Sequence, residues 1–383
     1  MKALLFERKP ARYAAANVAA RVMPGKGATV GPLSLRDVDE PPLPASDWVR
    51  VRPRLAGICG SDLATIDGHS SRYFEPIVSF PFTPGHEVVG DLDDGTRAVL
   101  IPILTCAVRS VVPMCAWCQA GQPNRCERIA FGHLEPGLQT GFCKSTGGGW
   151  STAFVAHESQ LVRVPDDLSD EDAVIVEPTA CAVHAARSVL PGDVAVIGAG
   201  TLGLLSVAAL RHLAVDHTIV ATAKHPHQAS YAHELGADRV VAVSELPRVV
   251  RSLTGAMVIG AQLTAGITTV VDCVGSAESM QQALSVVAPG GEVALVGMPG
   301  PSTALDLTGL WHRESSLRGC YAYTRDDFDR AIELVRELHL GRLVSTTYPL
   351  ARYRDAVEHA ANAGGRGAVK IAFDMRAEKE RNR

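Results

Sequence analysis

The chain has 383 residues, a net charge of -4 and a pI near 6.4, with 46% apolar and 20% charged residues. This composition is typical of a globular protein, the length favours two domains, and the charge gives no reason to expect nucleic acid as a partner. The first ten residues hold only a short apolar run before Glu7, so we expect no signal peptide and a cytoplasmic protein. The uncharged run 194–210 is too short for a spanning helix, so we expect no membrane partner.

Residues 1–165 favour short strands, because apolar and polar residues alternate and Gly and Pro interrupt the runs. We expect strands in 1–8, 32–44 and 48–60, with a short helix in 11–22. The first half of the chain is therefore predicted to be mostly β.

Beyond Pro165 the pattern changes to apolar strands that alternate with amphipathic helices, which is typical of a doubly wound parallel sheet. In the stretch 167–189, Ser169 is predicted to cap a first helix and Pro178 to open a second. Strands are expected at 194–198, 217–223, 238–243, 268–275 and 290–297. Helices are expected at 201–213, 227–237, 279–288 and 326–341, with a final strand near 368–374.

The glycines Gly198, Gly200 and Gly203 follow an apolar strand and open an apolar helix. This spacing allows a tight turn and a close approach to a pyrophosphate at the helix N-terminus, so it predicts a dinucleotide site. NAD would require an acid at the end of the next strand, but that strand ends at Ala223, Lys224 and His225. The positive charge favours NADP, with NAD as the alternative.

Two groups of residues have the chemistry of zinc ligands. His86 and Glu87 are adjacent, Cys59 would add a soft ligand, and Glu177 would add a second carboxylate, a mixed set suited to a catalytic zinc. The second group crowds four cysteines into 21 residues, a pattern suited to a structural zinc: Cys106, Cys115, Cys118 and Cys126.

These motifs together resemble the zinc-containing medium-chain dehydrogenases/reductases, in the branch of polyol, threonine and glucose dehydrogenases. The resemblance rests on GICGSD, PFTPGHEVVG, the four-cysteine lobe, VEPTACAVHA, VAVIGAGTLG, HELGAD, VVDCVG and PGGEVALVGMPG. It implies an α/β protein with a mostly-β GroES-like catalytic domain at 1–186 and 318–383. It also implies a Rossmann domain at 187–317, and a homodimer or homotetramer.

The resemblance also assigns roles to single residues. Cys59, His86 and Glu87 match catalytic zinc positions, Glu177 matches the place where this branch keeps a Glu, and Ser61 matches the hydroxyl that takes the substrate proton. Cofactor contacts are expected at Gly198, Gly200, Thr201, Leu202, Gly203, Ala223, Lys224, His225, Cys273, Val274 and Gly297.

Three features depart from the family pattern. Eight residues separate Cys106 from Cys115 where two are usual. Ala64 stands where many members have a relay histidine, so the proton must leave through Ser61 and water or through a group such as His69. Residues 9–32 form an insertion that either covers the substrate cleft or lies on the surface.

The sequence therefore predicts an oxidoreductase that interconverts a secondary alcohol (a polyol, sugar or cyclitol) and a carbonyl with NADP(H), using zinc. Two alternatives stay open: a catalytically silent regulatory member of the family, and a zinc-free reductase.

Overall fold

The computed structural model describes residues 1–213, 217–260, 262–300 and 304–376. The chain divides into two compact units, unit 1 with Met1–Glu177 and Val335–Arg383, and unit 2 with Pro178–Leu334. The breaks fall inside two helices, α6 (Val176–Ala186) and α12 (Arg325–Leu338), whereas the sequence placed them at 186/187 and 317/318. The last seven residues of the predicted segment 318–383 lie outside the described residues.

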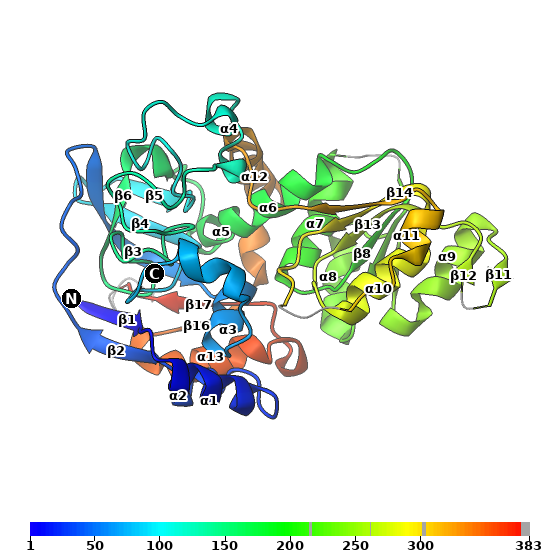
Figure 1. The fold of residues 1–383 in the computed structure, drawn as a ribbon, viewed down its shortest axis with the longest axis horizontal. Coiled ribbons are helices and arrows are strands. Elements are labelled where there is room, and N and C mark those ends of the chain that lie inside the picture. Colours follow the sequence, from blue (N-terminus) through cyan, green and yellow to red (C-terminus); the bar gives the residue numbers. More distant parts are fainter. Residues whose placement is uncertain (214–216, 261, 301–303, 377–383) are drawn as a thin grey trace. The chain divides into compact units, whose positions relative to one another are not determined.

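Unit 1 is mostly β, as predicted (Figure 1). Its main sheet has seven strands in the order β16-β17-β3-β4-β5-β7, with β6 paired to β3, and a separate antiparallel pair joins β1 to β2. Its strands are β1 (Lys2–Phe6), β2 (Leu33–Asp37), β3 (Trp48–Gly57), β4 (Val88–Leu92), β5 (Arg97–Leu100), β6 (Phe154–His157), β7 (Leu161–Arg163), β16 (Val344–Tyr348) and β17 (Lys370–Asp374).

The helices of unit 1 are short. They are α1 (Pro10–Ala20), α2 (Gly27–Val30), α3 (Gly60–Ile66), α4 (Ala116–Gln119), α5 (Asp170–Val174) and α13 (Tyr353–Ala361). Single 3-10 turns lie at Arg72–Ile77, Pro123–Arg125, Glu158–Gln160, Leu340–Leu343, Leu350–Arg352 and Gly364–Arg366. Ser169 caps α5 as predicted, but the next helix begins at Val176 and not at Pro178, because proline is tolerated within the first turn of a helix.

The insertion 9–32 packs on unit 1 beside the helix that follows β3. The buried carboxylate of Asp67, at the end of α3, accepts hydrogen bonds from the backbone N–H groups of Gly25 (2.7 Å) and Gly27 (3.0 Å). Asn17 donates to the carbonyl of Gly68 at 2.8 Å, and Asn362, just past α13, donates to Pro24 at 3.0 Å. The insertion is therefore fastened to α3 and to the end of α13.

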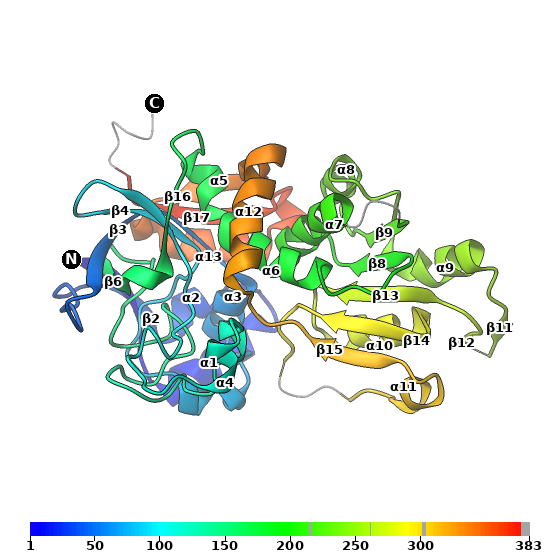
Figure 2. The same cartoon turned by 90° about the horizontal axis from the view of Figure 1, so that it is seen from above.

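Unit 2 is a doubly wound sheet of six parallel strands in the order β10-β9-β8-β13-β14-β15 (Figure 2), which confirms the predicted fold. The strands are β8 (Val194–Ile197), β9 (Ile219–Thr222), β10 (Arg239–Val241), β13 (Ile267–Asp272), β14 (Val287–Leu295) and β15 (Ser316–Gly319), with a small hairpin of β11 (Val258–Ile259) and β12 (Gln262–Leu263). The remaining elements are α7 (Thr201–Leu213), α8 (Pro226–Glu234), the turn Val243–Glu245, α9 (Leu246–Thr254), α10 (Ala277–Val286) and α11 (Thr308–His312).

The strand order of unit 2 reverses between β8 and β13, because the chain winds outward from β8 in one direction and from β13 in the other. In open parallel sheets, ligands bind beyond the carboxyl ends of the strands at such a switch point. Among the described residues, no helix is long and apolar enough to cross a membrane.

Candidate metal centres and cofactor site

The first candidate metal centre joins the end of β3 to the segment before β4. Cys59 directly precedes α3, and His86 and Glu87 directly precede β4, a strand that pairs with β3. One ligand atom from each of these three residues lies within 4.8 Å of the others, and both His86 and Glu87 are buried. A thiol, an imidazole and a carboxylate gathered in this way fit zinc.

Asp62 supports this group from behind. Its Oδ2 accepts a hydrogen bond from the backbone N–H of Cys59 at 3.0 Å, and its Oδ1 lies 3.5 Å from Nδ1 of His86. Burial acts to lower the pKa of His86, but the charges of Asp62 and of the Cys59 thiol outweigh it and hold the pKa well above its ordinary value. A carboxylate behind a ligating histidine fixes the ring orientation, and metal binding would displace the ring proton.

Lys370, the first residue of β17, forms an ion pair with Oε2 of Glu87, and both side chains are buried. Its ammonium also donates to the carbonyl of Ile58 at 3.2 Å. Burial acts to lower the pKa of Lys370, but the charge of Glu87 outweighs it and raises the pKa. The pair neutralises a carboxylate that would otherwise be buried alone.

Lys370 and Asp62 were missed in the sequence. Asp62 stands three residues after Cys59, the spacing at which a side chain can bond back to the residue that begins a helix, and this was a usable signal. Lys370 is far away in the chain, and the only signal in the sequence was a charged residue at the start of a strand whose next three residues are apolar.

Three other residues predicted to act at this centre lie outside the group of Cys59, His86 and Glu87. Ser61 lies half-buried in the first turn of α3, and its carbonyl accepts a hydrogen bond from Oγ1 of Thr65 at 2.9 Å. Glu177 is buried in the first turn of α6 and does not belong to the group of ligand atoms found among the described residues. Its role at the metal stays a prediction, and His69 is exposed.

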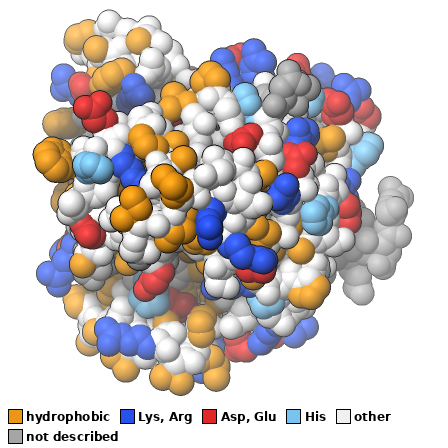
Figure 3. All heavy atoms as spheres, turned by 90° about the vertical axis from the view of Figure 1, so that its right-hand side faces the viewer, with side chains coloured by type: hydrophobic (Ala, Val, Ile, Leu, Met, Phe, Trp, Pro, Cys, Tyr) orange, Lys and Arg blue, Asp and Glu red, His pale blue; other side chains and the backbone are white. Residues whose placement is uncertain are grey.

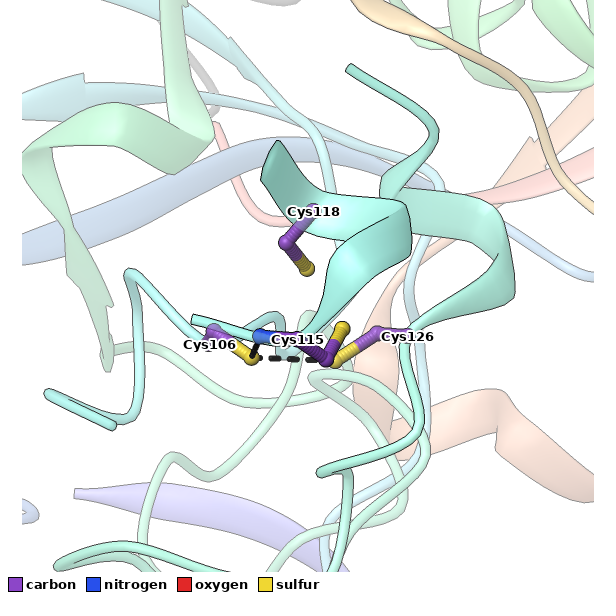
Figure 4. A group of neighbouring side chains, drawn as sticks. All are labelled: Cys106, Cys115, Cys118 and Cys126. Atoms are coloured by element: carbon purple, nitrogen blue, oxygen red, sulfur yellow. Dashed lines mark hydrogen bonds between the residues drawn. The ribbon is translucent and has the colours of Figure 1, made fainter. Parts of the chain in front are cut away.

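The second candidate metal centre is the four-cysteine lobe, residues 104–137. Its four sulfur atoms lie within 4.8 Å of one another, so the structure brings together Cys106, Cys115, Cys118 and Cys126 (Figure 4). The long spacing after Cys106 does not displace that residue, because the sulfur of Cys106 lies 3.7 Å from that of Cys126.

Backbone N–H groups of the lobe donate hydrogen bonds to two of its sulfur atoms. The N–H of Cys115 donates to the sulfur of Cys106 at 3.3 Å, and the N–H of Arg128 donates to the sulfur of Cys126 at 3.4 Å. Burial acts to raise the pKa of Cys115, but hydrogen bonds from the backbone of Cys118 and Glu127 lower it. At Cys118 and Cys126 burial prevails and raises the pKa, to about 11 for Cys126, so in the metal-free lobe the four thiols do not ionise together. Because thiolates are the zinc ligands, this donor set fits a closed structural site.

The candidate cofactor site lies at the switch point of unit 2. Gly198 follows β8 with a φ of 93°, in the left-handed region that favours glycine, and its N–H donates to Oγ1 of Thr222 at 2.9 Å. A Cβ at Gly203 would collide with the carbonyl oxygen of Gly198, whereas a Cβ at Gly200 would meet nothing within 4 Å. The loop thus packs tightly at Gly203 and leaves open space beside Gly200. Thr201 and Leu202 are the first two residues of α7.

The end of β9 carries the groups that were predicted to select the cofactor. Thr222 is the last residue of β9 and is followed by Ala223 and by Lys224, whose side chain is exposed. His225 precedes α8, and its ring stacks on that of His227 with centroids 5.8 Å apart. No carboxylate occupies the strand end, as the sequence already indicated.

Two further turns complete this edge of the sheet. The carboxylate of Asp272 accepts from the N–H groups of Val274 (2.9 Å) and Gly275 (3.1 Å), and so shapes the turn after β13. Gly297 follows β14 and donates to the carbonyl of Asp272 at 2.9 Å. Burial raises the pKa of Cys273 to about 12, so this thiol stays protonated at neutral pH and acts as a packing group.

A unit with clustered metal ligands and a second unit with a dinucleotide loop define a metal-dependent, dinucleotide-linked oxidoreductase. Comparison with known proteins agrees: residues 45–166 match the family model of the alcohol dehydrogenase GroES-like domain, and residues 201–337 match that of the zinc-binding dehydrogenases. The chain belongs to the zinc-binding medium-chain dehydrogenases, which act on alcohols and polyols with NAD or NADP.

Individual relatives are distant but cover most of the chain. L-Idonate 5-dehydrogenase of Vitis vinifera is 28% identical over 346 residues, covering 85% of this chain and 88% of the relative. Sorbitol dehydrogenase of Bacillus subtilis (strain 168) is 26% identical over 333 residues, covering 82% and 86%. The solved structure of alcohol dehydrogenase TADH from Thermus sp. ATN1 is 26% identical with a TM-score of 0.73, covering 98% of this chain and all of that one.

Proposed function

We propose that the protein interconverts a secondary alcohol, of the polyol, sugar or cyclitol type, and the corresponding carbonyl by hydride transfer with NADP(H). The observation that supports this most is the group of Cys59, His86 and Glu87, whose ligand atoms lie within 4.8 Å of one another. Relatives named for L-idonate and sorbitol, both polyhydroxy compounds, favour a substrate of that class.

In this proposal Cys59, His86 and Glu87 hold a zinc ion, with Glu177 as the fourth candidate. As a Lewis acid, a zinc ion held there lowers the pKa of a bound hydroxyl group. Asp62 keeps the ring of His86 oriented. Ser61 takes the hydroxyl proton of the substrate and passes it to water or to His69, because alanine occupies position 64.

Unit 2 is proposed to orient the cofactor. The loop from Gly198 to Gly203 takes the pyrophosphate at the N-terminus of α7, and the turns at Val274 and Gly297 flank it. The exposed ammonium of Lys224 favours the 2′-phosphate of NADP over the free hydroxyls of NAD.

The direct test follows the absorbance of reduced nicotinamide against a panel of polyols, sugars, cyclitols and simple secondary alcohols, with NAD and NADP side by side. We expect turnover with a polyhydroxy substrate, about two zinc ions per chain, and loss of turnover in Cys59→Ser. Cys320→Ser is the matched control, because Cys320 is a half-buried thiol of unit 2.

The alternatives make different predictions in the same test. A catalytically silent member would bind NADP and zinc without turnover on any substrate. A zinc-free reductase would keep its activity after chelation and in Cys59→Ser. Either result would overturn the proposal.

Replacing Lys224 tests the cofactor preference separately. We expect Lys224→Ala to raise the KM for NADP about tenfold, since a charge-assisted contact to phosphate contributes about 1.4 kcal/mol or more, and to leave the KM for NAD unchanged. Arg248→Ala, which removes an exposed cation from the same unit, is the control. An equal effect on both cofactors would rule out recognition of the 2′-phosphate by this side chain.

A further inference from the structure

Arg109 lies in the long spacing between Cys106 and Cys115 and is completely buried. A buried guanidinium requires hydrogen-bond acceptors and a compensating charge, because burial of a cation costs several kcal/mol. Within the described part of the chain, no carboxylate forms an ion pair with Arg109. Arg109 takes no part in the chemistry proposed for the first metal centre.

All five N–H groups of the guanidinium are satisfied by backbone carbonyls. Nε donates to Leu104 at 3.2 Å, and the four remaining N–H groups donate, at 2.8 to 3.2 Å, to the carbonyls of Phe131, Leu134, Glu135 and Gly137. Leu104 precedes the first cysteine of the lobe, and the other four acceptors follow the last one. One side chain thus ties together the first and the last segment of the four-cysteine lobe.

The main chain of Arg109 takes part in the same closure. Its N–H donates to the carbonyl of Thr105 at 3.0 Å, and its carbonyl lies 3.0 Å from Nδ1 of His133. Gly132 has a φ of 87°, and a Cβ there would lie 3.0 Å from Cβ of Arg109, so the returning loop packs closely on this residue.

Two cysteine thiols lie near Arg109. Cys126, one of the four lobe cysteines, and the buried Cys143 both act to raise the pKa of Arg109, against the dominant effect of burial, which lowers it. The sulfur of Cys143 donates to the carbonyl of Glu135 at 3.4 Å, the same carbonyl that accepts from Arg109. Four thiolates around one zinc ion carry a net charge of -2, which one guanidinium halves.

We propose that Arg109 is the internal cation of the four-cysteine lobe: it closes the lobe from within, holds the four thiols together before metal binds, and partly neutralises the tetrathiolate when zinc is present. Arg109 is then a positioning residue for the metal centre. The six extra residues after Cys106 supply it, which gives this departure from the usual spacing a structural purpose.

The first experiment uses the wild-type protein stripped of metal. Hydrogen–deuterium exchange is followed at amides bonded inside the lobe, those of Arg109, Val111 and His133. We expect exchange at least 100-fold slower than in an unfolded peptide, because the carbonyl contacts do not require metal. Exchange at the rate of an unfolded peptide would overturn the proposal, and this readout does not depend on enzyme activity or on whether zinc is the native metal.

The second experiment loads the protein with zinc and measures zinc loss to a colorimetric chelator. We expect loss at least tenfold faster in Arg109→Met than in the wild type. Arg125→Met is the matched control, since Arg125 belongs to the same lobe but its guanidinium lies exposed over the ring of Trp117, and we expect loss within twofold of the wild type.

Arg109→Lys separates charge from geometry, because lysine keeps the charge but has three donors on one atom in place of a planar fork. We expect zinc loss to remain at least fivefold faster than in the wild type. If Arg109→Lys behaves as the wild type, or if Arg125→Met loses zinc as fast as Arg109→Met, closure by the guanidinium is wrong. If Arg109→Met does not fold, zinc loss from Arg109→Lys and hydrogen–deuterium exchange in the metal-free wild type still test the proposal.

Discussion

At the scale of single residues, the buried ion pair of Lys370 and Glu87 allows two effects at the first metal centre to be measured separately. One is the contribution of the pair to stability, and the other is the contribution of the Glu87 carboxylate to activity. Each charge is tolerated only because the other lies beside it. Removing one partner of a buried ion pair leaves the other charge uncompensated and is strongly destabilising, whereas removing both is much less harmful.

We therefore expect Lys370→Met to lower the free energy of unfolding of the metal-free protein by about 3–5 kcal/mol, measured by urea denaturation. The double variant Lys370→Met/Glu87→Gln should recover a large part of this loss and remain inactive, because the carboxylate is gone. A double variant that loses the sum of the two single losses would contradict the pairing.

The residues of the site that could be predicted were those with a local signal. Cys59, His86 and the lobe cysteines have side chains that bind metals. Gly198 was recognised by its spacing from Gly200 and Gly203. Lys370 and Arg109 carry no such mark, because their importance comes from what surrounds them after folding. Buried charges of this kind are determined by tertiary contacts, which a sequence pattern does not contain.

At the scale of elements, long apolar segments with marked ends were predicted well and short segments were missed. The helix 201–213 was predicted with the bounds that α7 has, because its glycine loop and long apolar run mark both ends. α9 was missed although it is clearly amphipathic, because it is short and carries Pro247 in its first turn, which is also typical of a loop. The hairpin of β11 and β12 was also missed, because its two-residue strands have no detectable period.

The fastening of the insertion to α3 leads to a prediction about catalysis. α3 begins directly after Cys59 and contains Ser61, while Asp67 at its other end anchors Gly25 and Gly27. Asp67→Ala removes two hydrogen bonds to a buried charge and should cost about 3 kcal/mol of stability. It should also lower kcat about tenfold with KM changed less than threefold, because misplacement of catalytic groups acts on the chemical step.

The matched control for this change is Val18→Ala on the exposed face of α1. We expect it to leave kcat and the protease resistance of residues 10–31 unchanged, while Asp67→Ala loses that resistance. If Asp67→Ala releases the insertion but keeps the full kcat, the insertion does not position α3.

A second junction of elements, between α6 and α12, predicts a dependence on pH. His184 pairs through Nδ1 with the buried carboxylate of Asp327 at 2.8 Å, and Arg187 donates to the same carboxylate at 2.8 Å. Burial acts to raise the pKa of Asp327, but the hydrogen bonds of His184, Thr324 and Arg187 outweigh it and hold the pKa well below its usual range.

A lowered pKa means that Asp327 stabilises the fold above the ordinary pKa of an aspartate, near 4, and that this contribution is lost as the pH falls through the lower value of the folded state. We expect Asp327→Asn to lose roughly 2–3 kcal/mol at pH 7, and the gap to the wild type to narrow below about pH 4. Urea denaturation at several pH values measures this, and a gap that stays constant down to pH 2.5 would contradict it.

At the scale of the whole molecule, the sequence predicted two kinds of architecture but not where one changes into the other. The break between the units lies within α6 and within α12. In α6 it coincides with Pro178, which favours the start of a helix and does not mark a domain boundary, and α12 contains no glycine or proline. Assembly is also beyond local patterns, because it depends on what the folded surface leaves uncovered.

The uncovered edge of unit 2 leads to a prediction about assembly. β15 ends the six-stranded sheet, and among the described residues no strand pairs with its outer side. Leu317 on this strand is 37% exposed, and Trp311 on α11 just before it is 81% exposed. Apolar side chains are scattered over the face that carries α11 and the β11–β12 hairpin (Figure 3).

An exposed edge strand offers unpaired N–H and C=O groups, and two identical edges that pair antiparallel about a two-fold axis close into a dimer. We therefore propose a homodimer joined at β15, and expect Leu317→Lys to weaken it at least 100-fold, because like charges would face each other across the axis. Light scattering and analytical ultracentrifugation at micromolar concentration measure the change. Val18→Lys, an equally drastic exposed change in unit 1, should leave the dimer intact, and a monomeric wild type or a dimeric Leu317→Lys would exclude this edge as the interface.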